Sequence, residues 1–135
     1  MNRQEILDAL SAFPYDRSEY WAVTGGAMVL HGVRAGTTDV DLGCSAKLAD
    51  RLEADGYLYR LQENGRRWFR YGEHIEIFEG WLYGGTETVD GIQVLSLNGL
   101  IEMKQALGRE KDLKDLALIR AFLDRANADG TRERI

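Results

Sequence analysis

The sequence predicts a single α/β (α+β) domain over residues 1–135, built on a mixed β-sheet with flanking helices. Its length of 135 residues is that of one ordinary domain. Hydrophobic residues make up 44% and charged residues 29%, which is typical of a globular protein. Helix-like and strand-like stretches alternate along the chain, and the only proline, Pro14, leaves no proline-rich linker between them. Residues 126–135 form a polar tail that we expect to fray.

The first half of the chain predicts helices and strands in alternation. Ile6 and Leu10 share one face of a helix that ends before Pro14. The run 20–23 is aromatic and β-branched and stops at a glycine pair, which is typical of a strand. The remaining elements of this half are a short helix over 27–31, a strand over 37–42 and a helix over 46–55 that Ser45 caps.

The second half predicts short strands followed by two helices. Asn64–Gly65 and Tyr71–Gly72 suit hairpin turns and separate the first three strands. Ser96 or Asn98 is expected to cap a helix that stops near Gly108. The strands are expected at 57–62, 67–71, 74–78 and 92–95. Asp112 is expected to cap the last helix, with Leu113, Leu116, Ala117 and Leu123 facing inward.

Charge and cysteine content exclude several classes of function. The sequence has 17 basic and 22 acidic residues, and the net charge of −5 argues against a dedicated binder of bare nucleic acid. Cys44 is the single cysteine, which excludes an internal disulfide and a cysteine-rich zinc site. The apolar runs are too short to span a membrane, and residues 1–10 lack the apolar stretch of a signal peptide. We therefore expect a cytoplasmic protein without a membrane partner.

The central chemical feature is the pair Asp39 and Asp41. On a strand, residues two apart point to the same face, so both carboxylates would lie together while Val40 and Leu42 face the core. Two adjacent like charges repel, and a cation between them removes that cost. Carboxylate oxygens suit Mg²⁺ or Mn²⁺. The alternative is two solvated aspartates on an exposed strand face.

A third acid and a glycine pair extend this pattern. Glu76 lies between two isoleucines, and its carboxylate would join Asp39 and Asp41 if the two strands are neighbours. Three carboxylates suit a two-metal phosphoryl or nucleotidyl transfer site. Gly25 and Gly26 follow a strand and precede a helix, where backbone N–H groups can approach phosphate oxygens. Otherwise Glu76 is a solvent-facing strand residue and the glycines form a tight turn.

These residues together resemble a known superfamily. Thr24–Ala27 followed by Thr38–Asp41 resembles the nucleotidyltransferases of the polymerase β type, which have a Gly-Gly or Gly-Ser turn before a D-x-D or D-x-E strand. The segment from Gly32 to Asp41 is similar to the G-x-R … T-x-D-x-D form of small bacterial AbiEii-like nucleotidyltransferases. The resemblance implies a minimal nucleotidyltransferase fold, Mg²⁺ or Mn²⁺ as cofactor, a nucleoside triphosphate as substrate and a toxin–antitoxin setting. It also implies that Asp39, Asp41 and Glu76 are the catalytic residues and the metal ligands.

The C-terminal third carries the resemblance further. Leu97–Lys104 followed by Gly108–Leu116 is similar to the last motif of the AbiEii-like subgroup, in which a helical lysine precedes an R-x-K-D-x-x-D run. The resemblance implies that Lys104 contacts the triphosphate. Arg109, Lys111, Asp112 and Asp115 would support the phosphate side of the site or the packing beneath it. The nucleotide-binding residues that follow from the motifs are Gly25, Gly26, Lys104, Arg109 and Lys111.

Two departures from the family pattern suggest a second hypothesis. Ala27 stands where many members have serine, and Glu76 stands where the third acid is usually aspartate. The first hypothesis is an enzyme that transfers a nucleoside monophosphate to a hydroxyl of a small molecule, a tRNA or a protein. The alternative is a catalytically weakened module that keeps the fold for binding or regulation.

The segment around 57–71 carries a third hypothesis. Four arginines, of which Arg66 and Arg67 are adjacent, alternate there with aromatic residues, as in an RNA-binding platform. The alternative is aromatic core residues with a solvated basic face. Trp81 and Tyr83 are aromatic residues that we expect to be exposed, and they suggest pairing with a second copy of the chain or with a partner protein.

Overall fold

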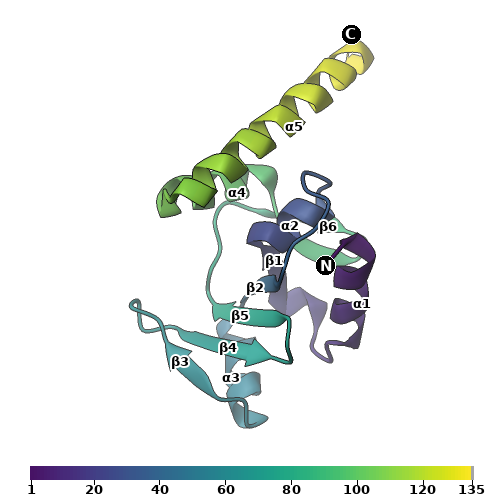
Figure 1. Ribbon diagram of the computed structural model, residues 1–135. Helices are drawn as coiled ribbons and strands as arrows, with labels where there is room; N and C mark the ends of the chain where they lie inside the picture. The colour runs from purple at the N-terminus through teal and green to yellow at the C-terminus, as the bar shows by residue number, and fades with distance from the viewer. Residues whose placement is uncertain (135) are drawn as a thin grey trace.

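The structure is a computed structural model that describes residues 1–134, with side chains described for residues 1–127. A seven-stranded sheet in the order β3-β4-β5-β2-β1-β7-β6 forms its centre (Figure 1). The strands are β1 (Tyr20–Val23), β2 (Val40–Cys44), β3 (Tyr59–Leu61), β4 (Arg67–Tyr71), β5 (Ile75–Glu79), β6 (Thr86–Val89) and β7 (Ile92–Leu95). The α-helices are α1 (Arg3–Ala12), α2 (Thr24–Leu30), α3 (Ala46–Ala54), α4 (Leu97–Leu107) and α5 (Glu110–Arg134), and a 3-10 turn covers Arg17–Glu19.

The sheet is mixed, as the sequence predicts. β2 pairs in parallel with β5, β1 pairs in parallel with β7, and the other neighbours are antiparallel. Side chains alternate between the two faces of a strand, so the register divides the sheet into an apolar face and a second face. The second face carries Asp41, Glu76 and Arg70 side by side on β2, β5 and β4. We call it the carboxylate face.

The apolar face is covered by helices from the first half of the chain. Ile6 and Leu10 of α1 and Leu48 and Leu52 of α3 are buried in one core with the inward strand residues. Asn2 caps α1 and Ser45 caps α3 through hydrogen bonds from backbone N–H groups, which fixes where each helix begins. Complete burial of such aliphatic side chains contributes roughly 1.5–3 kcal/mol each, so this face holds the domain together.

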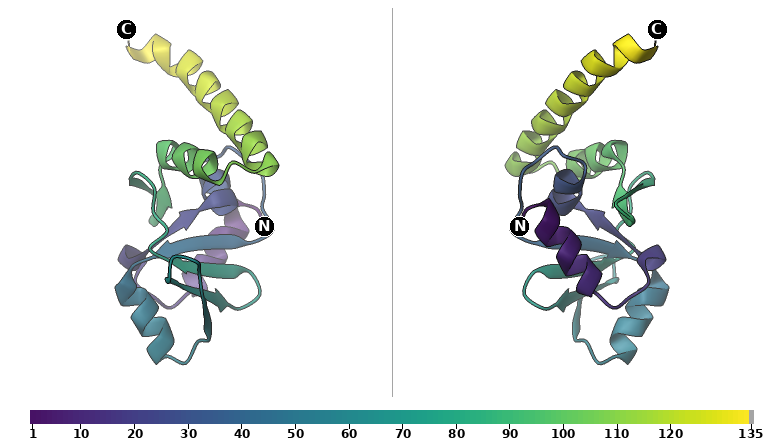
Figure 2. Two further views of the ribbon diagram at one scale, coloured as in Figure 1. Left: turned by 90° about the vertical axis from the view of Figure 1, so that its left-hand side faces the viewer. Right: turned by 90° about the vertical axis from the view of Figure 1, so that its right-hand side faces the viewer.

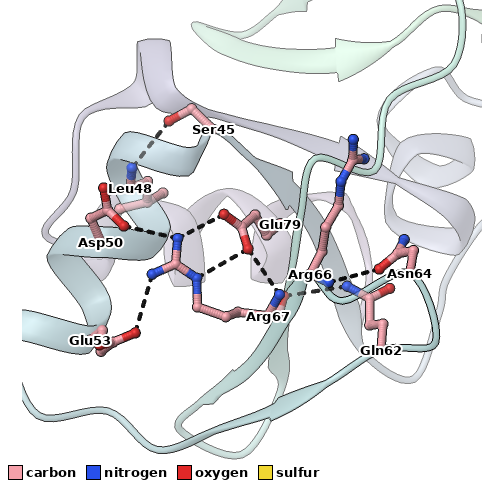
Figure 3. Close-up of polar contacts among 9 residues, drawn as sticks. All are labelled: Ser45, Leu48, Asp50, Glu53, Gln62, Asn64, Arg66, Arg67 and Glu79. Carbon is pink, nitrogen blue, oxygen red and sulfur yellow. Dashed lines mark hydrogen bonds and ion pairs between the residues drawn. The ribbon is translucent and has the colours of Figure 1, made fainter.

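An ionic cluster joins the β4 strand to α3 on this apolar face (Figure 3). The guanidinium of Arg67 contacts Glu79 at 2.7 Å, Asp50 at 2.9 Å and Glu53 at 3.2 Å. The Arg67 hydrogen bonds hold the pKa of Glu79 below its usual value against the opposing effect of burial. Arg67 is therefore a structural residue of the β4–α3 contact.

The carboxylate face is partly covered by aromatic rings and by the segment that follows β5. The rings of Trp68 and Phe78 stack at 5.7 Å, and Phe78 contacts Trp81 edge-on at 4.8 Å. The Nε1 of Trp21 donates a hydrogen bond to the backbone oxygen of Trp81. Gly43 must lack a side chain here, since a Cβ would lie 2.1 Å from the Trp21 indole. The segment around Trp81 thus lies across β1 and β2.

Most strands agree with the sequence prediction. The expected strands 20–23, 67–71 and 92–95 are β1, β4 and β7 with identical bounds. The strand expected over 37–42 begins three residues later, at Val40, so Asp39 lies in the bend before β2. The sequence did not predict β6, an edge strand whose side chains are largely exposed. Without buried apolar positions, β6 has no period-two hydrophobic pattern to detect.

The C-terminal helices also correct two expectations. Ser96 caps α4 and Gly108 ends it in the left-handed conformation, as expected. The α5 helix begins at Glu110, and Asp112 lies inside its first turn, accepting a hydrogen bond from the Arg109 backbone instead of serving as the cap. Leu113 is 60% exposed and Ala117 is exposed as well, whereas Leu116 and Ile119 are the buried apolar residues in the described part of this helix.

The α5 helix extends away from the sheet (Figures 1 and 2). It continues from Glu110 to Arg134 and so includes most of the segment 126–135 that we expected to fray. The fraying stays a prediction, since the side chains from 128 onward and residue 135 lie outside the described part of the chain. Among the helices in the described residues, none combines the length and the apolar character that crossing a membrane requires.

Candidate functional site

Two carboxylates meet because β2 and β5 are parallel neighbours. Asp41 lies opposite Glu76 in the register of this strand pair, so their side chains emerge next to each other on the carboxylate face. Asp39 lies one residue before β2, where the backbone N–H of Val40 extends the ladder to the His74 oxygen. The condition for the three acids to converge, that the Glu76 strand lies beside the aspartate strand, is therefore met.

Asp41 is a partly buried carboxyl with an altered protonation equilibrium. Burial raises the pKa of Asp41 from 3.8 to about 6, a hydrogen bond from Thr24 opposes this, and the charges of Glu76 and Asp39 add to it. The Thr24 Oγ1 donates to the Asp41 Oδ2 at 2.8 Å. A carboxylate that burial and like charges destabilise in this way is typical of functional sites.

Thr24 reaches Asp41 from a strained backbone position. Its φ of 52° lies in the left-handed region, which a β-branched residue rarely adopts. Such a conformation costs on the order of 1–3 kcal/mol and persists only when its surroundings hold it. Thr24 is buried at the first position of α2, directly after β1. The strain occurs at the point where the glycine pair begins, beside the carboxylates.

Gly25 and Gly26, which we expected before a helix over 27–31, lie in the first turn of α2, and we call this turn the glycine turn. The two glycines differ in what they leave room for. A Cβ on Gly25 would lie 2.5 Å from the Thr37 Oγ1 and 3.2 Å from an Arg34 nitrogen, so these side chains require glycine there. A Cβ on Gly26 would meet nothing nearer than Val40, at 3.7 Å. Packing thus explains Gly25 and does not explain Gly26.

His74 lies at the rim of the site. Its Nδ1 is 3.7 Å from the Asp39 Oδ1, and its side chain is half exposed. The expected strand over 74–78 begins with His74; the structure places His74 in the turn before β5, facing Asp39. A protonated His74 would neutralise part of the negative charge around the three acids.

A buried ionic network joins α4 to α5. The Lys104 ammonium lies 2.9 Å from Asp115 and 3.4 Å from Asp112, and all three side chains are at least nine-tenths buried. Asp112 also accepts a hydrogen bond from the Arg109 Nε at 2.6 Å. Burial acts to raise the pKa of Asp112, but the Arg109 hydrogen bonds and the Lys104 charge outweigh it and lower the pKa overall. Lys104 and Arg109, which we expected near the triphosphate, are engaged by these two aspartates.

Arg34 connects this network to the glycine turn. One of its guanidinium nitrogens forms an ion pair with Asp115, and another lies close to where a Gly25 side chain would be. In the sequence, Arg34 stands out only as part of the motif between Gly32 and Asp41, and we did not predict it as a site residue. Its signal is the G-x-R spacing after α2. Lys111, in the first turn of α5, is exposed.

The carboxylate donor set suits a divalent cation chemically. Within the described residues, no group of three or more histidine, cysteine or acidic side chains is already arranged to hold a metal ion. Asp41 and Glu76 nevertheless lie in register. The charges of Glu76 and Asp39 add to the effect of burial in raising the pKa of Asp41, and a cation between the carboxylates would relieve that repulsion. Oxygen ligands of this kind fit Mg²⁺ or Mn²⁺.

The comparisons with known proteins concern the fold. No family model matches the sequence, and no curated protein matches it. Among solved structures, the chain is similar to TM1012 of Thermotoga maritima, provisionally assigned as a nucleotidyltransferase, with a TM-score of 0.60, 19% identity and coverage of 93% of this chain and 96% of that one.

The second similar structure is the lincosamide antibiotic adenylyltransferase LnuA with lincomycin bound. Its TM-score is 0.55 at 13% identity, and the match covers 86% of this chain and 92% of LnuA. These similarities extend over nearly the whole of each chain. The chain therefore has the mixed-sheet fold found in nucleotidyltransferases.

Proposed function

We propose that this protein is a Mg²⁺-dependent nucleotidyltransferase that moves a nucleoside monophosphate from a nucleoside triphosphate to a hydroxyl acceptor. One observation carries the proposal: Asp41 and Glu76 lie in register on parallel strands, with Asp39 one residue before the start of β2, next to the glycine turn. The similarity in fold to LnuA and to TM1012 supports it. The AbiEii-like resemblance and the toxin–antitoxin setting remain hypotheses based on sequence motifs alone.

Asp39, Asp41 and Glu76 are the residues that would hold the divalent cations. When bound, the ions supply positive charge to the transferred phosphoryl group and to the leaving pyrophosphate. Thr24 keeps the Asp41 carboxylate turned toward this position through its 2.8 Å hydrogen bond. Because Asp41 titrates near pH 6, it is ionised at neutral pH and available as a ligand.

Other residues around the site accept the proton of the acceptor or bind the triphosphate. Glu76, at the outer side of the carboxylates, accepts the proton of the attacking hydroxyl. Gly25 and Gly26 offer backbone N–H groups to the triphosphate, and Arg34 supplies a cation next to them. Lys104 and Arg109 hold Asp112 and Asp115, and Asp115 in turn holds Arg34, so their proposed role is to position the phosphate side. Lys111 is the exposed cation that remains available to the nucleotide.

Nucleotide-dependent stabilisation tests this function. A ligand that binds only the folded state raises the melting temperature by mass action. We expect one or more of the four nucleoside triphosphates to raise the melting temperature only with Mg²⁺, and Asp39→Asn to abolish the shift. Asp8→Asn, an exposed substitution on α1, is the matched control and should leave the shift unchanged.

The alternative, a binding or regulatory module with weakened chemistry, predicts a different result. Ala27 and the lack of a pre-arranged metal cluster in the described residues favour this alternative. Such a module would show no Mg²⁺-dependent nucleotide shift, and Asp39→Asn would behave like Asp8→Asn. That outcome would contradict the proposed enzyme.

A further inference from the structure

A pocket of about 560 Å³ opens beside Glu76 on the carboxylate face. Pockets that bind small molecules typically have volumes of about 300–1,000 Å³. The side chains that matter for its chemistry come from Glu76 and from the β3–β4 hairpin with the residue before it. They are Leu58, Tyr59, Arg60, Trp68, Arg70 and Glu76.

The order of strands places this pocket on the attacking side of the proposed reaction. The sheet runs β4-β5-β2-β1, so Arg70, Glu76 and Asp41 follow one another toward the glycine turn after β1. In an in-line displacement the attacking and leaving oxygens lie on opposite sides of the phosphorus. If pyrophosphate leaves at the glycine turn, the attacking hydroxyl comes from the Glu76 side, where the pocket lies.

The walls of the pocket combine apolar surface with positive charge. Leu58 is 91% exposed and contributes apolar surface to the pocket. Trp68 is fixed by its stack on Phe78, and its indole N–H is enclosed without a hydrogen-bond partner in the described part of the chain. A buried indole N–H usually finds a partner, and the Trp68 donor has none among the described residues.

Two arginine side chains of the hairpin are available to contact a ligand in the pocket, and the other two are not. Arg66 donates to the Gly80 oxygen, and Arg67 is engaged by the acidic residues of the β4–α3 contact (Figure 3). The Arg60 side chain makes no hydrogen bond or ion pair within residues 1–127, and the Arg70 side chain makes one bond, to the Glu73 oxygen. The hairpin therefore presents two guanidinium groups at one pocket instead of a continuous basic track along a nucleic-acid backbone.

We propose that this pocket binds the acceptor, and that the acceptor is a small hydroxyl compound with a flat ring and a carboxylate or phosphate group. The ring packs on Leu58 and Trp68, and Arg60 and Arg70 bind the anionic group. The hydroxyl oxygen forms a bond to the α-phosphorus, and its proton passes to the Glu76 carboxylate. The bond from the α-phosphorus to the bridging oxygen breaks, and its electron pair leaves with pyrophosphate. This assignment rests on the proposed nucleotidyl transfer.

Binding of a matched pair of probes tests the pocket without the need for turnover. 4-Hydroxybenzoate carries the ring, the hydroxyl and the charge, whereas 4-hydroxybenzyl alcohol lacks the charge. In two-dimensional ¹H–¹⁵N NMR spectra, Trp68→Phe assigns the Trp68 indole signal. We expect millimolar 4-hydroxybenzoate to shift that signal, and the double variant Arg60→Gln/Arg70→Gln to weaken its binding about tenfold, or roughly 1.4 kcal/mol.

The control variant and the uncharged probe make the result specific. Arg51→Gln removes an exposed arginine from α3, behind the opposite face of the sheet, and should leave the affinity unchanged. The double variant should bind 4-hydroxybenzyl alcohol as the wild type does. The proposal is overturned if the Trp68 signal does not respond, or if the double variant binds 4-hydroxybenzoate normally. It is also overturned if oligouridylate binds more tightly than 4-hydroxybenzoate and depends on the same two arginines.

Failure of the pocket and failure of the proposed function give different readouts. Asp41→Asn leaves the pocket walls intact and should still bind 4-hydroxybenzoate, while it loses Mg²⁺-dependent nucleotide binding. A wild-type protein that binds nucleotide with Mg²⁺ but not 4-hydroxybenzoate contradicts the acceptor assignment alone. One that binds 4-hydroxybenzoate but no nucleotide contradicts nucleotidyl transfer, and with it the identification of the ligand as its acceptor.

Discussion

Asp41 is held by contacts that act on its protonation in opposite directions. Burial and the charges of Glu76 and Asp39 favour the neutral acid, whereas the hydrogen bond from Thr24 favours the carboxylate. The net effect is a pKa of about 6 in the folded protein against 3.8 for an ordinary aspartate. Between these two values the folded state binds more protons than the unfolded state, so stability falls as the pH rises through this window.

The substitution Asp41→Asn should therefore stabilise the protein at high pH. The amide oxygen of asparagine can still accept from Thr24, and the buried charge is gone. We expect a gain of about 2 kcal/mol in the free energy of unfolding at pH 8 and little difference near pH 4. Urea denaturation at both pH values measures this gain in the free energy of unfolding, with Asp8→Asn as the control. A gain that is the same at both pH values would contradict this account.

The glycine turn permits a comparison of two adjacent residues. Gly25→Ala would push a Cβ into Thr37 and the Arg34 guanidinium, so we expect it to cost about 1–3 kcal/mol of stability. Gly26→Ala meets only Val40 at contact distance and should be neutral or stabilising by about 0.5–1 kcal/mol, because alanine favours the helix. If the Gly26 backbone approaches phosphate, the same variant should weaken Mg²⁺-nucleotide binding despite its stability.

Denaturation measures the stability of both glycine variants, and nucleotide titration measures their binding of Mg²⁺-nucleotide. A Gly25→Ala protein as stable as the wild type would contradict the packing of Thr37 and Arg34 against this turn. A Gly26→Ala protein that binds nucleotide normally would remove Gly26 from the proposed phosphate-binding residues.

Single residues also show what could be inferred from the sequence. The D-x-D pair, Glu76 and the glycines are recognisable because each belongs to a short pattern with chemical meaning. Thr24 and Arg34 were not selected, since their importance depends on contacts with Asp41 and Asp115, which are 17 and 81 positions away. A threonine or an arginine carries no signal of such a partner until the fold brings the two together.

At the scale of elements, α4 and α5 are joined by buried charge instead of apolar packing alone. Lys104, on α4, faces Asp112 and Asp115 on α5, and Arg34 adds a second cation to Asp115. Removal of one partner from a buried ionic network leaves an uncompensated charge. This network therefore fixes the angle at which α5 leaves the domain and the position of Arg34 beside Gly25.

The substitution Asp115→Asn tests that network. We expect a loss of about 3 kcal/mol in the free energy of unfolding, because Lys104 and Arg34 both lose a charged partner. Asp124→Asn, an exposed change on the same helix, should alter stability by less than about 0.5 kcal/mol. Thermal or urea unfolding compares the two variants, and equal stabilities would show that the network contributes nothing.

The elements also differ in how far the sequence predicts them. β1, β4 and β7 are bounded by turn residues and rich in aromatic and β-branched side chains, so their limits follow from local preference. β6 is an exposed edge strand that forms because β7 provides a partner, and local preference does not reveal it. The start of β2 at Val40 depends likewise on its pairing with β5.

For the whole molecule, the decisive event is a pairing between distant segments. β2 and β5 become parallel neighbours although α3, β3 and β4 lie between them in the chain. The sequence indicates what would follow from this pairing but not that the pairing occurs. The same arrangement leaves the carboxylates at one end of a sheet face and the pocket over its outer strands.

Contacts with other molecules are the feature of this protein that its sequence predicts least well. Trp81 and Tyr83, which we expected to be exposed and to support self-association, are partly buried against the core. The homodimer stays a prediction without that support. Of the hairpin arginines, Arg67 belongs to the β4–α3 contact and Arg66 bonds to the Gly80 oxygen, so two remain at the pocket, which favours a small acceptor over an RNA.

The central claim is that Asp39, Asp41 and Glu76 bind a divalent cation together with a nucleoside triphosphate. Mn²⁺ broadens NMR signals close to where it binds, so ¹H–¹⁵N spectra recorded with substoichiometric Mn²⁺ and nucleotide test it most directly. We predict that broadening centres on the amides of Thr24, Asp41 and Glu76 and that Asp41→Asn removes it. Broadening that is absent from these residues, or that persists unchanged in Asp41→Asn, would contradict the claim.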